Sequence, residues 1–488
     1  MEVHFCWKTT KYSSPSQVFL KNAAIYLTKF IFQIALANKT LHLVLASTLQ
    51  RYSFMQETFI HYIWRYRRME EAVLYTSQRE PIQIIYPGAY NTDAGPDFLQ
   101  AKLKIGDTLW AGNVEMHVKA SDWRKHGHQH DAAYQNVVLH VVWEEDEPIT
   151  LANGTPLPCL ELQPITTPSL FQAYKKLAYN QRKIPCQNQL PNITPLKFQL
   201  WLDRLVVERL EQKTNYWQQQ LELQQNDWES VFYQALASNL GMPVNKEAME
   251  RLARITPLLM LQKHRDNVQQ IEALLFGQAG MLNEAFVEAY PQKLQQEYLF
   301  LSKKYKLQAM ETVNWKYARM RPSHFPSLRI AQLARLIFQS EHLFSKILVV
   351  QSPEEVYRML EVKVSNYWRD HYRLDQLSHH STDKQIGRSM IDLIIINTIV
   401  PFLFLYGKLR DLQKYKDRSL DLLGQIKSEN NKLIREWASR GIDSNNAFDS
   451  QGLLHLYKHY CSQKRCLECA VGVELLNHIS SDKGDKLR

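Results

Sequence analysis

The hydrophobic pattern of this chain changes once, and the change divides it into an α/β part and a helical part. Between residues 81 and 144, apolar side chains alternate or run continuously over short stretches, which is typical of strands. From Thr194 onward they recur at helical spacing, as at Trp201, Leu205 and Leu210. A chain of 488 residues is also too long for one ordinary core. We therefore predict an α+β protein with a small α/β domain followed by a large all-α domain.

The α/β part is expected to run in the order helix, three strands, helix, strand. The predicted elements are a helix over 56–75, strands over 81–86, 101–105 and 110–119, a short helix from Asp131 and a strand over 136–144. The predicted boundaries are an extension at 1–54, the α/β domain at 55–165, a linker at 166–193, the helical domain at 194–478 and a polar tail at 479–488.

Residues 1–54 differ from the rest in being apolar and almost free of acids, and they carry about half of the net charge of +10. They are open to three interpretations: a secretory signal, a membrane-surface helix, or sequence upstream of a true start at Met55. We favour the third because an ordinary domain opening begins at Met55.

Charge and cysteine content bear on the cellular location. Lys29 and Lys39 interrupt the first apolar stretch, and Leu393–Gly407 is short and contains Pro401, so no membrane span is predicted. Six cysteines are too few for a disulfide framework in a chain of this length, which favours the cytoplasm. Nothing in the sequence specifies an oligomeric state.

The densest polar cluster lies in two segments, Asn91–Phe98 and Gly112–Lys119. Alternation along a strand places Glu115, His117 and Lys119 on one face, and a hairpin would bring Asp97 beside them. Two carboxylates within about 6 Å, next to a cation, suit a Mg²⁺ or Mn²⁺ ion that activates water against a phosphodiester. The alternative is that Asp97 closes a turn and that the strand face is simply solvated.

This pattern resembles the signature of the PD-(D/E)XK nucleases, and the element order matches their core. The resemblance rests on Pro96-Asp97, a hairpin-length gap and Glu115-x-His117. It implies that Asp97 and Glu115 hold the metal and that Glu57 on the leading helix adds a ligand.

The resemblance also implies that Tyr134 or Gln135 contacts phosphate. The sequence departs from the family at the third position, where the family has Lys and this chain has His117. Lys119, two residues further on the same face, is the candidate replacement, and without one the fold would be catalytically silent.

A run of histidines offers a second interpretation of the same region. His126, His128 and His130 alternate and are followed by Asp131, a set that can bind Zn²⁺ in a metallohydrolase. The alternative is a polar loop ahead of a helix, with Asp131 in its first turn. His140 lies in an apolar strand and is expected to be a hydrogen-bonded core residue.

Three cysteines gather near the C terminus as Cys461-x4-Cys466-x2-Cys469. Thiolates at this spacing suit Zn²⁺ or an iron–sulfur cluster, which need a fourth ligand. His459 could complete the set locally, or Cys186 from afar, as a distant Cys does in iron–sulfur PD-(D/E)XK nucleases, whose trio has a different spacing. The alternative is three buried thiols packed in a helix.

The helical part also contains arginines interleaved with aromatic residues. Arg319, Arg321 and Arg329 stand among Trp315, Tyr317 and Phe325, a pattern typical of surfaces that contact phosphates. The alternative is a helix end whose arginines cap carbonyls and pair with acids.

As a whole, residues 55–478 resemble a family of bacterial proteins whose function is unknown, so this resemblance implies no activity. The segments that carry it are Gly95-Pro96-Asp97-Phe98, Gly112–His117, Ser121-Asp122-Trp123, Leu139–Val142 and Phe276–Gly280.

The sequence thus predicts a metal-dependent nuclease or a nuclease-like nucleic-acid-binding protein. A non-catalytic binding or scaffold protein on a degenerate nuclease fold is the second hypothesis, and a zinc hydrolase using the histidine run is the third. An intact Asp97–Glu115 pair separates the first from the second, and metal at His126 and His128 would favour the third.

Overall fold

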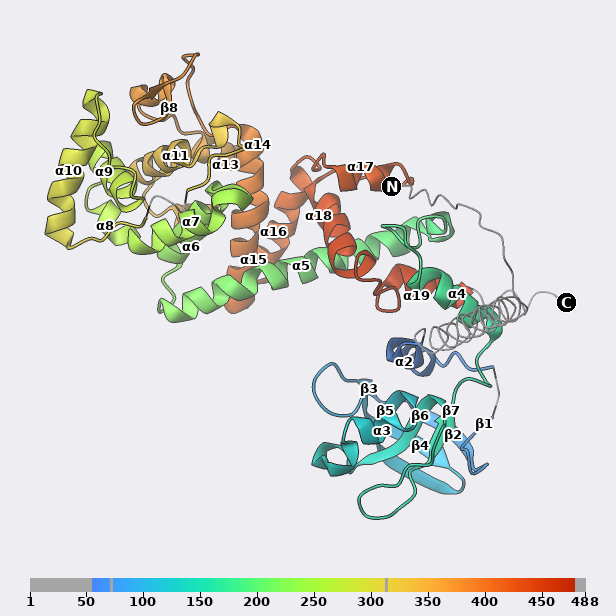
Figure 1. Cartoon of the computed structure of the whole chain (residues 1–488). Coiled ribbons are helices and arrows are strands. Elements are labelled where there is room, and N and C mark those ends of the chain that lie inside the picture. The colour runs from blue at the N-terminus through green and yellow to red at the C-terminus, as the bar shows by residue number, and fades with distance from the viewer. Residues whose placement is uncertain (1–54, 71–72, 312–314, 479–488) are drawn as a thin grey trace, which may run out of the picture. The chain divides into compact units, whose positions relative to one another are not determined.

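The computed structural model describes residues 55–70, 73–311 and 315–478. The chain divides into two compact units, Met1–Tyr174 and Lys175–Arg488, which are considered separately (Figure 1). The predicted extension at 1–54 and tail at 479–488 lie outside the described residues.

In the first unit, helix α2 (Glu57–Arg65) packs against the sheet through an apolar face that includes Phe59, Ile63 and Trp64. The sequence predicted a helix reaching residue 75. Instead, α2 ends at Arg65, because Arg67 has a left-handed φ of 51° that a helix does not tolerate.

One mixed sheet forms the body of this unit, in the order β1-β2-β4-β5-β6-β7, with β3 paired to β4. The strands are β1 (Leu74–Tyr75), β2 (Pro81–Tyr86), β3 (Ala89–Tyr90), β4 (Phe98–Ile105), β5 (Thr108–Lys119), β6 (Val137–Glu144) and β7 (Cys159–Glu161). The pairs up to β4–β5 are antiparallel, whereas β5–β6 and β6–β7 are parallel.

A parallel pair needs a crossover, and the β5–β6 crossover carries the histidine run. It consists of α3 (Asp122–Lys125) and two short 3₁₀ turns, η1 (His128–His130) and η2 (Ala132–Tyr134). The helix predicted from Asp131 is therefore only a single turn. The parallel register places His140 of β6 opposite Glu115 of β5.

The second unit is almost entirely helical, and the predicted α+β class is confirmed as a mixed-sheet domain followed by a mostly helical region. Part of the predicted linker at 166–193 is helix α4 (Pro168–Ala178), and a 3₁₀ turn η3 (Leu190–Asn192) follows it. The remaining helices are α5 (Pro195–Leu223), α6 (Trp228–Leu240), α7 (Met242–Ile255), α8 (Leu258–Gln262), α9 (Val268–Gln278), α10 (Ala289–Tyr305), α11 (Pro326–Gln339), α12 (Leu343–Ile347), α13 (Pro353–Leu360), α14 (Arg388–Ile394), α15 (Val400–Leu409), α16 (Gln413–Gln425), α17 (Lys432–Ala438), α18 (Ala447–Leu456) and α19 (Ala470–His478).

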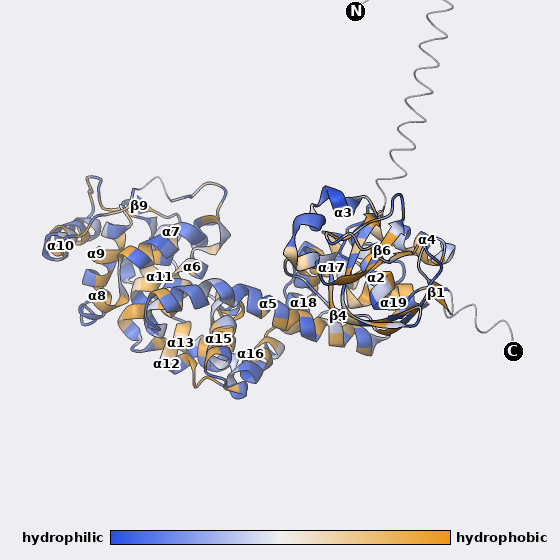
Figure 2. Cartoon of the chain, turned by 90° about the horizontal axis from the view of Figure 1, so that it is seen from below, coloured by the Kyte–Doolittle hydropathy of each residue, from blue (hydrophilic) through white to orange (hydrophobic). Residues whose placement is uncertain are grey.

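These helices show hydrophobic and hydrophilic residues side by side along their length, as expected of helices that each bury one face (Figure 2). The helical run Arg388–Leu409 is the one candidate membrane span among the described residues, and 78% of its most apolar window is buried within the fold. The segment Leu393–Gly407 therefore behaves as the buried core helix that the sequence predicted, with Ile399 and Phe402 fully enclosed.

Candidate functional site

Strand β5 delivers Glu115 and His117 to the same side of the sheet, because alternate strand residues share a face. Both side chains are buried, with residue exposures of 5% and 1%. The predicted alternative of a solvated strand face is therefore wrong for this pair. A buried carboxylate is costly unless a cation or hydrogen-bond donors compensate it, so the surroundings of Glu115 decide what this face can do.

Asp97 lies directly beside Glu115, and the two residues are linked through backbone amides. The amide of Asp97 donates to Oε2 of Glu115 at 3.1 Å, and the amide of Met116 donates to Oδ2 of Asp97 at 2.9 Å. Burial and the nearby charge of Asp97 raise the pKa of Glu115 far above its usual range, although the amide of Asp97 opposes the shift. The structure thus brings together the two carboxylates that the sequence singled out.

Helix α2 adds Glu57 and His61, which are four residues apart and so share a helix face. Nε2 of His61 lies 3.4 Å from Oδ2 of Asp97. Burial, followed by the charge of Asp97, raises the pKa of Glu57, and His126 and His61 oppose this shift. Glu57 is therefore near enough to Asp97 for the two carboxyl groups to influence each other, and its role as a metal ligand stays a prediction.

Three histidines complete the cluster on the other side of Glu115. Ligand nitrogens of His117, His126 and His128 all lie within 4.8 Å of one another. Nε2 of His117 is 3.2 Å from Nδ1 of His126, while Nε2 of His128 lies 3.3 Å from Oε1 of Glu115. This group combines imidazole nitrogens with a carboxylate oxygen.

Gly127, in the crossover between β5 and β6, has a backbone conformation that helps the histidines to come together. This residue has φ 75°, a left-handed conformation that glycine adopts without strain, and it stands between His126 and the 3₁₀ turn that begins at His128. The ring of His128 then stacks on Tyr134 with a centroid separation of 3.8 Å. Burial, with smaller contributions from the charges of Glu115 and Asp97, raises the pKa of Tyr134 to about 12.

His140 orients the ring of His117 through a hydrogen bond. Its Nε2 is 2.8 Å from Nδ1 of His117, so one nitrogen donates and the other accepts, and Nε2 of His117 is left facing Glu115 at 3.6 Å. Burial and the neighbouring histidines lower the pKa of His117 to about 2, and burial lowers that of His140 to about 3. Both rings are therefore neutral at physiological pH, the form that binds metals.

Several predicted residues do not join this cluster. His130 and Asp131 are exposed, and Asp131 instead accepts from the amide of Ala133 at the start of η2. Lys119 lies 3.5 Å from Glu144 on the adjacent strand, and Gln135 is exposed. Among the described residues, His130 and Asp131 stand outside the group that His117, His126 and His128 form, and their zinc binding stays a prediction.

In the helical unit, Arg329 contradicts its predicted role at a nucleic-acid surface. It begins the second turn of α11, is only 4% exposed, and its Nη1 donates to Oε1 of Gln332 at 2.8 Å. Arg319 and Arg321 are exposed in the segment before that helix.

The cysteines predicted to bind metal also lie in the helical unit. His459 stacks on His455 with a centroid separation of 4.3 Å, whereas Cys186, Cys461, Cys466 and Cys469 come near one another. Among the residues that the structure describes, the thiols do not form a group as tight as the three histidines.

Sequence reasoning missed His61 and undervalued His140. The spacing of Glu57 and His61 on one helix face was available as a signal for the former. Nothing local indicated that His140 would meet His117, because that contact depends on the parallel register of β6.

The types of ligand atom in the cluster, imidazole nitrogens and carboxylate oxygens, indicate which ion it suits. Nε2 of His61 and of His128 are buried without a hydrogen-bond partner and face carboxylates. Imidazole nitrogens favour Zn²⁺ and related transition metals, whereas Mg²⁺ prefers oxygen ligands. The residues therefore fit a transition metal, and the predicted Mg²⁺ fits them less well.

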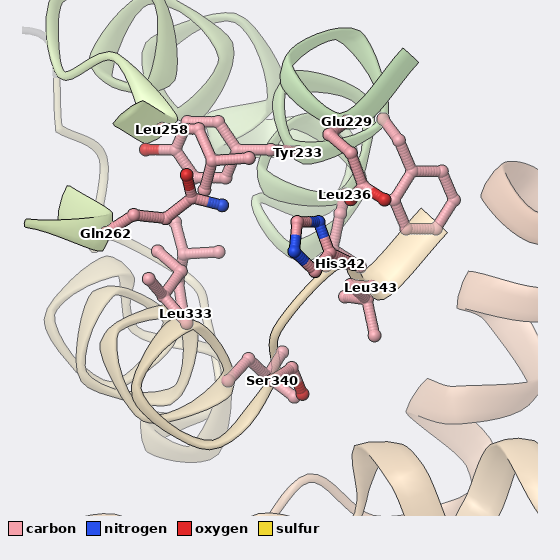
Figure 3. Close-up of a pocket in the computed structure, with 12 residues that line it drawn as sticks. Glu229, Tyr233, Leu236, Leu258, Gln262, Leu333, Ser340, His342 and Leu343 are labelled. Atoms are coloured by element: carbon pink, nitrogen blue, oxygen red, sulfur yellow. The ribbon is translucent and has the colours of Figure 1, made fainter. Parts of the chain in front are cut away.

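A small pocket with a cavity volume of about 30 Å³ lies in the helical unit. Figure 3 shows Leu236, Leu258, Leu333 and Leu343 around it, with His342 at one side. Its acidic residue Glu229 already accepts from the backbone amides of Phe344 and Ser345, so this space offers little chemistry.

A family model described as Protein of unknown function (DUF2851) matches residues 57–432 of this chain. The match spans both the mixed-sheet domain and most of the helical region. No curated protein and no solved structure matches the chain.

Proposed function

This chain belongs to the DUF2851 family, and on that premise we propose that its mixed-sheet domain is a transition-metal-dependent hydrolase. One observation carries the proposal: Glu115 adjoins three histidines whose ligand nitrogens lie within 4.8 Å of one another. His117, His126, His128 and Glu115 would hold the ion. When bound, such an ion supplies a water that is acidified toward neutral pH.

The residues around the cluster have distinct tasks in this proposal. The amide of Asp97 fixes one oxygen of Glu115, which leaves the other oxygen directed at the histidines. His140 fixes the ring of His117. Such supporting hydrogen bonds orient ligands and raise their basicity.

Glu57 is the proposed proton carrier. Its raised pKa brings it nearer to neutral pH, where a carboxyl group can both accept and return a proton. Burial is the largest cause of this rise, the charge of Asp97 adds to it, and His126 and His61 oppose it.

The proposed substrate is a phosphodiester. This proposal is supported by the adjacent carboxyl groups of Asp97, before β4, and Glu115, within β5, two residues that the PD-(D/E)XK resemblance of the sequence implies as metal ligands. The mixed sheet, with β5 joined to β6 by a crossover, is compatible with that resemblance. Arg319 and Arg321 would contact nucleic-acid phosphates and make binding weaken steeply with salt.

A non-catalytic nuclease-like binding protein is the second candidate, and one observation favours it. The nuclease signature needs a cation near its carboxylates, yet Lys119 is directed to Glu144. In that case nucleic acid would bind without cleavage.

The test is cleavage of labelled single- and double-stranded DNA and RNA by the full-length chain with Zn²⁺, Mn²⁺, Co²⁺ or Mg²⁺. We expect cleavage with a transition metal, its loss in His128→Asn, and its retention in His130→Asn. His130 is the matched control because it lies in the same run outside the cluster. Salt-sensitive binding without cleavage under any ion would favour the second candidate. If the chain neither binds nor cleaves nucleic acid, nucleic acid is excluded as the substrate.

A further inference from the structure

Four free cysteines gather in the helical unit, although one lies far from the others in sequence. They are Cys186, which follows α4, and Cys461, Cys466 and Cys469, which lie between α18 and α19. Cys461 and Cys466 flank one tight turn, in which the amide of Lys464 donates to the carbonyl oxygen of Cys461 at 3.3 Å and the amide of Cys466 donates to that of Lys464 at 2.8 Å. Cys186, Cys461 and Cys469 are buried, and Cys466 is partly buried.

Lys464 fastens the distant segment to the C-terminal trio. Its Nζ donates to the carbonyl oxygens of Asn180, at 2.5 Å, and Arg182, at 2.9 Å. The side chain of Asn180 in turn donates to the carbonyl of Pro185, immediately before Cys186. The fold itself therefore holds Cys186 against the loop between Cys461 and Cys466.

The trio is held in a tight local structure. Cys461 ends the π-helical turn η8 (Tyr457–Cys461), an uncommon geometry that is frequent at functional sites. A Cβ on Gly472 would lie 2.0 Å from the carbonyl oxygen of Cys466, so only glycine allows the Cys466 backbone to approach the start of α19. This close approach brings Cys466 alongside Cys469.

Burial raises the pKa of the Cys469 thiol, and two backbone amides oppose that rise. The backbone amides of Val471 and Gly472, in the first turn of α19, are directed at the sulfur. Amides at a helix N-terminus favour a thiolate over a thiol. Packing of neutral thiols alone requires no such donors.

We propose that Cys186, Cys461, Cys466 and Cys469 are the four thiolate ligands of a metal centre that ties the start of the helical unit to its end. This site is independent of the histidine cluster in the mixed-sheet domain. Zn²⁺ and iron–sulfur clusters are the centres that take four cysteine thiolates.

The spacing of the cysteines bears on the choice between these centres. The x2 spacing of Cys466 and Cys469 occurs in zinc sites, whereas Cys-x4-Cys-x2-Cys with a distant fourth Cys occurs in two-iron clusters.

The test begins with full-length protein purified anaerobically and analysed for zinc, iron and inorganic sulfide. We expect either about one zinc or about two to four irons with matching sulfide per chain. Zinc without sulfide identifies an ion, and iron with sulfide identifies a cluster. His117→Asn/His128→Asn should retain this metal, which separates it from any ion at the histidines.

Variants then locate the ligands. Cys186→Ser and Cys469→Ser should each lose the metal, whereas Cys159→Ser should keep it, because Cys159 is buried in β7 of the other unit. If the serine variants are insoluble, Co²⁺ added to the metal-free wild type should give thiolate-to-cobalt charge-transfer absorption. Retention of metal in Cys186→Ser, or no thiolate-bound zinc, iron or cobalt in the folded wild type, would overturn the proposal.

Discussion

Asp97 and Glu115 are held side by side by two hydrogen bonds that cross between β4 and β5. The amide of Asp97 donates to the Glu115 carboxylate at 3.1 Å, and the Asp97 carboxylate accepts from the amide of Met116 at 2.9 Å. Each carboxylate therefore has one oxygen fixed by the backbone. The free oxygen of Glu115 meets His128, while the bound oxygen of Asp97 also lies near His61.

Glu115→Gln removes the negative charge of this side chain while keeping its size and shape. The amide keeps the acceptor for Asp97 but cannot ionise, and ionising the buried Glu115 carboxyl without a cation is unfavourable. We expect the metal-free variant to be as stable as the wild type or more stable. For the wild type, Zn²⁺ or Mn²⁺ at a hundredfold excess over Kd should stabilise the fold by about 3 kcal/mol, and in the variant this stabilisation, with the rise in Tm that it causes, should largely disappear.

Thermal unfolding with and without the ion measures this effect. Glu144→Gln, which alters the Lys119 pair on the neighbouring strand, should retain the shift. A full metal-induced shift in Glu115→Gln would remove this carboxylate from the ligand set.

His140→Leu tests the hydrogen bond behind His117. Loss of the partner at 2.8 Å frees the ring to rotate, and supporting residues of this kind typically contribute about 10- to 100-fold to metal affinity. We expect a weakening of that size in competition titrations with a chelator, with the mixed sheet intact by circular dichroism. An unchanged affinity would mean that the contact serves packing alone.

Glu272 on α9 predicts a pH-dependent stability in the helical unit. It is 1% exposed and accepts from the hydroxyl of Tyr290, and burial raises its pKa to about 7 from an ordinary value of 4.5. Between these values the folded state holds the proton that the unfolded state has lost. Its stabilising contribution is therefore complete below about pH 4.5 and falls as pH rises through 7.

Glu272→Gln removes this titration while keeping the hydrogen-bonding shape. The stability of the wild type relative to the variant should fall by about 3 kcal/mol from pH 4.5 to 7.5 and level off above that. Urea unfolding across this range measures the difference, with Glu247→Gln on the exposed face of α7 as the control. Parallel curves for wild type and Glu272→Gln would contradict the burial argument.

Much of the mixed sheet was predictable because its strands carry strong periodicity. Alternation in β5 correctly placed Glu115 and His117 on one face, and the short gap between two strands correctly brought Asp97 to them. Periodicity could not reveal that His140 would meet His117, since that contact follows from the register of a parallel pair after a crossover.

The histidine run shows most clearly what alternation in the sequence cannot predict, namely which of the three side chains come together. Alternation alone treats His126, His128 and His130 alike, yet only the first two have ring nitrogens that lie close to one of His117, and His126 remains exposed there. Likewise, aromatic neighbours made Arg329 look like a surface residue, although its place on the packed face of α11 buries it.

The most direct test of the central claim is the position of a bound ion in crystals of the full-length chain grown with Zn²⁺ or Mn²⁺. Anomalous scattering at the metal edge should give a peak about 2 Å from nitrogens of His117, His126 and His128 and from an oxygen of Glu115. A peak held only by Asp97 and Glu57, or no peak at the histidines at saturating metal, would contradict the account.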